Sequence, residues 1–163
     1  MNHRQTPFEF SESLVKGKIV ETVFFRMFSH SGNYVVLPFG YENVLPAIAG
    51  ISSNGNDDDA VSAIKRAPDF VIIDKEEPHD VKLVEVKYMK HPSAEKVLEK
   101  ATLILQSWRP AYLFLATPKG FYLEKVAEIV KNKGAMNLLG EEIISRDLQA
   151  EYANLVNKYI EPL

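Results

Sequence analysis

Two short apolar segments in the middle of the chain constrain its fold most. They are Asp69–Asp74 (DFVIID) and Lys82–Tyr88 (KLVEVKY), and both are rich in β-branched residues, which favour strands. The connection between them contains KEEPHD, where Pro78 interrupts any hydrogen-bonded ladder. We therefore predict two consecutive strands that pair as an antiparallel hairpin.

The segments around this hairpin predict alternating helices and strands. An apolar stripe over Ala94–Trp108 indicates a helix that ends before Pro110, and Ala111–Thr117 (AYLFLAT) indicates a strand buried on both faces. A strand, a helix and another strand in succession predict a right-handed parallel crossover. The other predicted elements are a helix over 10–29, a strand over 34–39, a helix over 121–133, a short edge strand over 142–145 and a final helix over 148–160.

Together these elements predict one α/β domain over residues 1–163, with a mixed sheet flanked by helices and the core order αβββαβ. Residues 41–66 are predicted to form an insertion between the first strand and the hairpin. The insertion contains the loop SSNGNDDD, with a short helix expected on each side, over 43–51 and 60–66.

Composition excludes several classes of protein. The chain has no cysteine, which excludes disulfides, thiolate nucleophiles and zinc–thiolate sites. It also lacks an apolar run that could span a membrane or serve as a signal peptide, so we expect a cytoplasmic protein with no membrane partner. No glycine-rich phosphate loop is present, which argues against nucleotide hydrolysis by that route.

Charge is distributed unevenly, although the net charge is only −3. Residues 82–133 contain ten Lys or Arg against five Asp or Glu, whereas residues 69–80 contain five acids and only Lys75. A basic zone after an acidic one can bring a polyanion to a metal site. The alternative is a solvated helix face, which the charges alone favour.

Alternation along the second strand of the hairpin brings Glu85 and Lys87 to the same face, roughly 7 Å apart. Asp69 joins them if directly opposite residues of the hairpin have numbers that sum to 154 or 156. A slip of one residue would send Asp69 to the other face. Two carboxylates placed in this way suit Mg²⁺ or Mn²⁺, with Lys87 either orienting or deprotonating a water, or stabilising charge on a phosphate. The alternative is an ordinary pair of charges on an exposed strand.

Pro68-Asp69 followed by Glu85-Val86-Lys87 resembles the PD-(D/E)xK signature of the restriction-endonuclease-like superfamily. The segments KGKIVE (16–21), RAPDFVIID (66–74) and KLVEVK (82–87) further resemble archaeal Holliday-junction resolvases and related nucleases, over about residues 14–117. The resemblance implies that Asp69 and Glu85 bind the metal, with a possible main-chain oxygen from Val86, and that Lys87 is catalytic. The chain departs from those resolvases in the insertion at 41–66 and in its lack of an overall basic character.

Glu21 is a further candidate for the metal site and for catalysis. On a helix its neighbours include Leu14, Gly17 and Phe25, a largely apolar surrounding in which a carboxylate needs a cation. The metal or Lys18 is the expected partner.

We therefore expect metal-dependent hydrolysis of nucleic acid, with DNA preferred, by a chain that acts alone, as a homodimer or with a partner subunit. The alternative is a nucleic-acid-binding or protein-interaction module on the same fold, without turnover.

Overall fold

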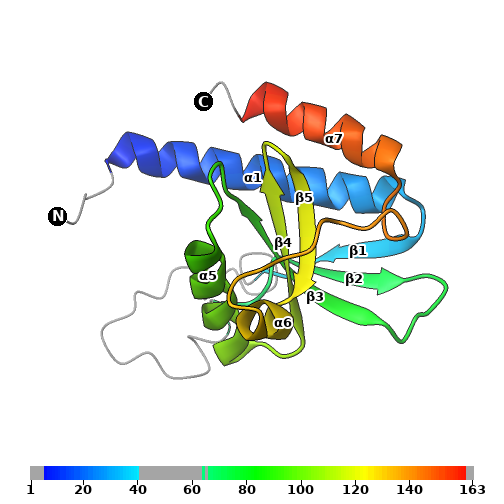
Figure 1. Cartoon of the computed structure of the whole chain (residues 1–163). Helices are drawn as coiled ribbons and strands as arrows, with labels where there is room; N and C mark the ends of the chain where they lie inside the picture. Colours follow the sequence, from blue (N-terminus) through cyan, green and yellow to red (C-terminus); the bar gives the residue numbers. More distant parts are fainter. Residues whose placement is uncertain (1–5, 41–63, 65, 161–163) are drawn as a thin grey trace.

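A computed structural model describes residues 6–40, 64 and 66–160. In this part of the chain a five-stranded mixed sheet, in the order β1-β2-β3-β4-β5, is flanked by helices on both faces (Figure 1). No helix in these ranges is long and apolar enough to cross a membrane. In chain order the elements are α1 (Pro7–His30), β1 (Tyr34–Pro38), β2 (Phe70–Asp74), β3 (Val81–Tyr88), α5 (Ala94–Ser107), β4 (Ala111–Thr117), β5 (Gly120–Lys125), α6 (Val126–Lys131) and α7 (Arg146–Tyr159).

The strand pairings confirm the predicted hairpin and crossover. β2 pairs antiparallel with both β1 and β3, whereas β3 and β4 are parallel and are connected through α5. The element order up to β4 is therefore αβββαβ, as predicted. β5 then pairs antiparallel with β4 and forms the far edge of the sheet.

The sheet separates two clusters of buried side chains. On one face α1 and α7 lie side by side and pack against Val84 and Val86 of β3 and Phe114 of β4 (Figure 1). On the other face α5 and α6 pack against Leu113 and Leu115 of β4. β4 contributes to both clusters because its successive side chains alternate between the faces, which explains its fully apolar sequence.

Helix α1 begins three residues earlier than predicted, at Pro7. The Thr6 hydroxyl accepts a hydrogen bond from the N–H of Glu9, and the Glu9 carboxylate accepts one from the N–H of Thr6. This reciprocal capping box, together with proline in the first turn, fixes the start of the helix. The buried residues of α1 lie only between Val20 and Phe28, so its first half projects from the core.

Two predictions for the C-terminal third were wrong. The helix predicted over 121–133 is strand β5 followed by the short helix α6. Gly120, with a φ of +132°, allows a tight turn after β4, and alternate residues Phe121 and Leu123 then reach the α1 cluster. The edge strand predicted over 142–145 is a turn, in which the N–H groups of Ile143 and Ile144 donate to the carbonyl of Gly140.

The final helix begins two residues before its predicted start. The short helices predicted over 43–51 and 60–66 lie outside the described residues, apart from residues 64 and 66, as does almost all of the predicted insertion.

Candidate functional site

The register of the hairpin brings Asp69 and Glu85 to the same face of the sheet. β2 pairs Phe70 with Val84 and Val71 with Leu83, so the numbers of directly opposite residues sum to 154. Asp69 immediately precedes β2 and, by continuation of this register, lies opposite Glu85. The even register that the sequence required is therefore confirmed. Lys87 follows on the same face, two residues along β3.

The site lies where the two edges of β3 differ. β3 pairs with β4 as far as Tyr88, but its register with β2 ends at Val84. The second half of β3 is therefore open on the side of β2. The N–H of Val86 on this open side donates to Oδ2 of Asp69, 2.8 Å away. The Asp69 carboxylate thus accepts the hydrogen bond that a backbone carbonyl of a neighbouring strand would otherwise accept from the Val86 N–H.

Backbone hydrogen bonds fix Asp69 from the other side. Its carbonyl accepts from the N–H of Phe39, at 2.8 Å, and from the N–H of Gly40, at 3.2 Å. The end of β1 therefore holds the main chain of Asp69, while β3 holds its side chain. Because both its main chain and its side chain are held by hydrogen bonds, the Asp69 carboxylate is preorganised for binding.

The electrostatics of this cluster are unfavourable for two ionised carboxylates. Burial and the charge of Glu85 raise the pKa of Asp69 to about 7, with a smaller contribution from Glu21, although Lys87 and the Val86 N–H oppose the rise. Lys87 Nζ lies 2.5 Å from Oε1 of Glu85. Burial lowers the pKa of Lys87, but the charges of Glu85 and Asp69 outweigh it, so that the pKa is raised. Within this group of three residues, the two carboxyl groups therefore face a single ammonium group.

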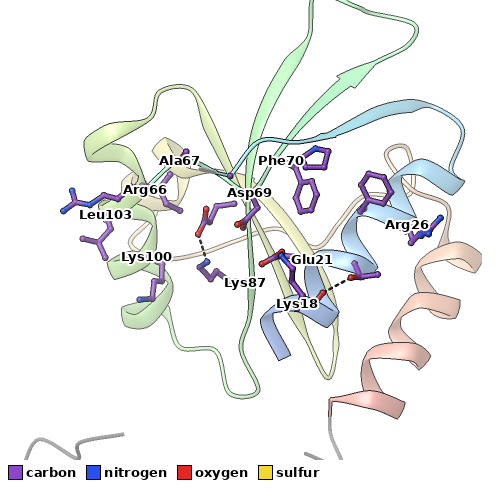
Figure 2. A pocket seen from close by; sticks show the side chains of 16 residues that line it. Lys18, Glu21, Arg26, Arg66, Ala67, Asp69, Phe70, Lys87, Lys100 and Leu103 are labelled. Atoms are coloured by element: carbon purple, nitrogen blue, oxygen red, sulfur yellow. Dashed lines mark hydrogen bonds and ion pairs between the residues drawn. The ribbon is translucent and has the colours of Figure 1, made fainter. Parts of the chain in front are cut away.

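Glu21 lies on α1 and faces the same cavity as Asp69 and Glu85 (Figure 2). Its Oε2 lies 2.7 Å from Nζ of Lys18, the second of the two partners that the sequence suggested. The predicted apolar surrounding is present only in part. Phe25 lines the same cavity, but Leu14 is 59% exposed, and a Cβ built at Gly17 would meet no described atom within 4 Å beyond its chain neighbours and the backbone of its own helix.

A cavity of about 630 Å³ connects these residues with further charges from α1, from α5 and from the segment before β2. In Figure 2, Arg66, Lys100 and Leu103 lie on one side of Asp69 and Lys87, and Arg26 lies on the other. Among the described residues, the charged side chains that line the cavity are the carboxylates of Glu21, Asp69 and Glu85 and the cations of Lys18, Arg26, Arg66, Lys87 and Lys100. The described part of the lining is therefore net cationic, in a chain whose net charge is −3.

The sequence prediction missed Arg26, Arg66 and Lys100. Of the basic zone at 82–133, only Lys87 and Lys100 line the cavity. Lys100 lies three residues after Val97 and directly before Ala101, both buried, so it borders the buried stripe of α5. The position of Lys100 beside the buried residues of its helix could have been predicted from the apolar stripe in the sequence. Arg26 and Arg66 are brought to the cavity by tertiary structure alone.

The residues present fit a hard divalent cation in part. Asp69 and Glu85 provide two opposed carboxylates with more negative charge than Lys87 compensates, which suits Mg²⁺ or Mn²⁺. Among the described residues, no three Asp, Glu, His or Cys side chains come close enough together to hold an ion. Two carboxylates are enough for Mg²⁺, which usually retains several waters. Glu21 as a third ligand stays a prediction.

Comparison with known proteins adds no relative to this description. No protein family, curated protein or solved structure matches the chain. The function is therefore argued from the cavity and its residues.

Proposed function

We propose that this chain is a divalent-metal-dependent phosphodiesterase that acts on nucleic acid, with DNA as the preferred substrate. The observation that carries the proposal is the placement of Asp69, Glu85 and Lys87 on one face, at the open edge of β3 and within a cation-lined cavity. The element order and the mixed sheet support a restriction-endonuclease-like fold.

Asp69 and Glu85 would hold Mg²⁺ or Mn²⁺ between their carboxylates. Because the N–H and C=O of one strand residue point to the same side, we expect the Val86 carbonyl to face the same open edge as its N–H, where it can add a ligand oxygen. The bound ion would supply Lewis acidity toward a phosphoryl oxygen and toward a water. The backbone donors of Val86, Phe39 and Gly40 keep Asp69 in position for this role.

Lys87 would act through its charge. Its ammonium group lies beside Glu85, and its side chain is 39% exposed, which leaves donors available on the side of the cavity. An ammonium in that position can donate to a non-bridging oxygen of a phosphate and stabilise the negative charge that develops there. The geometry favours this role over deprotonation of a water, because the ammonium is held by an ion pair.

A second candidate is a nucleic-acid-binding or protein-interaction module on the same fold, without turnover. The absence of a third ligand side chain among the described residues favours this alternative, as does the acidic net charge. Asp69, directly before β2, and Glu85 of β3 favour the enzyme, because a binding module does not require two opposed carboxylates beside a lysine.

The test is a cleavage assay in Mn²⁺ with single-stranded, duplex, flapped and four-way DNA, combined with calorimetry of Mn²⁺ binding. We expect Lys87→Ala to lower cleavage at least about a hundredfold and to leave most of the metal affinity, since an ammonium does not bind the ion. Asp69→Ala should lose both. Lys82→Ala is the control, because Lys82 is a lysine of the same strand on its other face. A wild-type protein that binds DNA without cleaving any form would support the binding module.

A further inference from the structure

The cavity beside the acids has apolar walls, which a site that binds only a phosphate does not need. Besides its charges it is lined by Phe25 of α1 and by Leu103 and Ile104 of α5. Leu103 is 40% exposed, which is a high value for a leucine of a helix that packs on a sheet. Apolar surface left open beside a charged centre indicates a ligand that brings an apolar face with it.

The cations are distributed on both sides of the acids. Lys18 and Lys87 are held by Glu21 and Glu85. Arg26, Arg66 and Lys100 form no ion pair with any residue in the described ranges 6–40, 64 and 66–160. Arg26 stands on one side of Asp69, whereas Arg66 and Lys100 stand on the other (Figure 2). Cations on either side of a reacting phosphate can hold its two neighbours along a strand.

This combination distinguishes single strands from duplexes. A duplex keeps its bases stacked inside and presents phosphates and sugars, so it cannot place a base against the walls of a cavity. An unpaired strand offers both phosphates and the faces of its bases, and proteins bind such strands with cations and apolar or aromatic side chains together. A duplex also favours a broad basic surface, whereas this chain has a net charge of −3.

We infer that the substrate is unpaired at the site, with a base against the apolar wall formed by Leu103 and Ile104 of α5 and with the flanking phosphates on Arg26 and on Lys100 with Arg66. This inference rests on the proposed function and specifies its substrate class.

The chain contains a matched pair of residues for the test. Leu103 and Leu155 are both 40% exposed, and each is the tenth residue of a 14-residue helix, but only Leu103 lines the cavity. The probes are a fluorescent 15-nucleotide thymidine strand and a blunt duplex of 15 base pairs, bound in Ca²⁺ and followed by anisotropy. We expect the single strand to bind at least about tenfold more tightly. Leu103→Ser should weaken strand binding about five- to tenfold, in the range of one base contact, while Leu155→Ser leaves it unchanged.

Salt dependence provides a second measurement with its own control. Lys100→Gln should reduce the slope of log affinity against log salt by about 0.7 for the single strand, the value expected for one lost phosphate contact. The control is Lys96→Gln. Lys96 lies one turn before Lys100 on α5 and does not line the cavity, so its substitution should leave the slope unchanged.

The outcomes separate the inference from the function on which it rests. If the duplex binds equally well or is cleaved faster in Mn²⁺, the single-strand inference is overturned and the nuclease proposal stands. Equal effects of Leu103→Ser and Leu155→Ser also overturn it, because the wall then contacts no base. If no form of DNA or RNA is bound or cleaved, the proposed function fails and the inference fails with it.

Discussion

From Val84 to Lys87 the two faces of β3 differ in burial and in charge, although their residues alternate along the same strand. Val84 and Val86 are 0% and 4% exposed and belong to the cluster beneath α1. Glu85 and Lys87 point to the opposite face, where they form an ion pair in the cavity. One face therefore contributes burial of apolar area, whereas the other holds charges that burial disfavours.

This difference indicates that stability and chemistry are assigned to alternate residues of β3. The valine face holds the sheet against α1 and thereby fixes the position of the strand. The charged face is then free to hold carboxylates that burial and mutual repulsion disfavour, the two effects that raise the pKa of Asp69. Functional sites commonly contain groups that reduce the stability of the fold that carries them.

The largest effects are expected at two neighbouring residues, where one substitution should reduce stability and the other should reduce activity. Val84→Ala removes two buried methyl groups and should lower the free energy of unfolding by about 2 kcal/mol. Glu85→Gln removes one of two opposed carboxylates and should leave the stability of the metal-free protein unchanged or slightly raised. Chemical denaturation of both variants measures the difference.

In cleavage activity the two variants should rank in the opposite order to their stability. Val84→Ala should retain cleavage at temperatures where it is folded, whereas Glu85→Gln should lose metal-dependent cleavage. If Glu85→Gln unfolds more easily than Val84→Ala, the ion pair with Lys87 is a structural requirement and the division between the two faces is wrong.

A smaller effect is expected from pH, through Asp69. Its pKa is about 7 in the fold and about 4 in an unfolded chain, so between these values the folded state holds a proton that the unfolded state has released. As far as this group is concerned, the stability of the metal-free protein should therefore be greatest below about pH 4, should fall as pH rises from about 4 to about 7, and should level off above that. We expect a loss of about 1 to 2 kcal/mol, allowing for partial exposure of the residue.

Asp69→Asn isolates this contribution. The variant should lack most of the decline between about pH 4 and about pH 7 in denaturation experiments, because asparagine does not titrate and can still accept the Val86 hydrogen bond. An identical decline in the variant would assign the pH dependence to another group.

The sequence was sufficient to predict which residues share each face of β3, because alternation is a local property of a strand. It also restricted Asp69 to an even register, and the connection between the strands was short enough to require a hairpin. In contrast, Phe121 and Leu123 were predicted as helical, because a short apolar segment after a turn has no periodicity long enough to decide.

Residues that reach the cavity from distant segments were not predictable in the same way. Arg26 depends on the packing of α1, and Arg66 depends on the path of the chain before β2. The prediction for Glu21 assumed largely apolar neighbours, but of Leu14, Gly17 and Phe25 only Phe25 lines the same cavity, and Leu14 is exposed. Local patterns show which way a residue points along its own element, whereas its neighbours across the fold depend on tertiary packing.

The smallest expected effect concerns Glu21, which contributes to the cavity from α1 and not from β3. Its carboxylate is held by Lys18 but still adds to the raised pKa of Asp69, so its negative charge acts through space on the proposed metal site. Glu21→Gln should therefore weaken Mn²⁺ binding only about two- to fivefold in calorimetry, and high salt should reduce the difference. Glu12→Gln is the matched control, because Glu12 forms a similar ion pair with Lys16 on α1 and is 24% exposed, against 27% for Glu21, but does not line the cavity. A loss as large as that of Asp69→Ala would instead make Glu21 a direct ligand and extend the metal site from the charged face of β3 to α1.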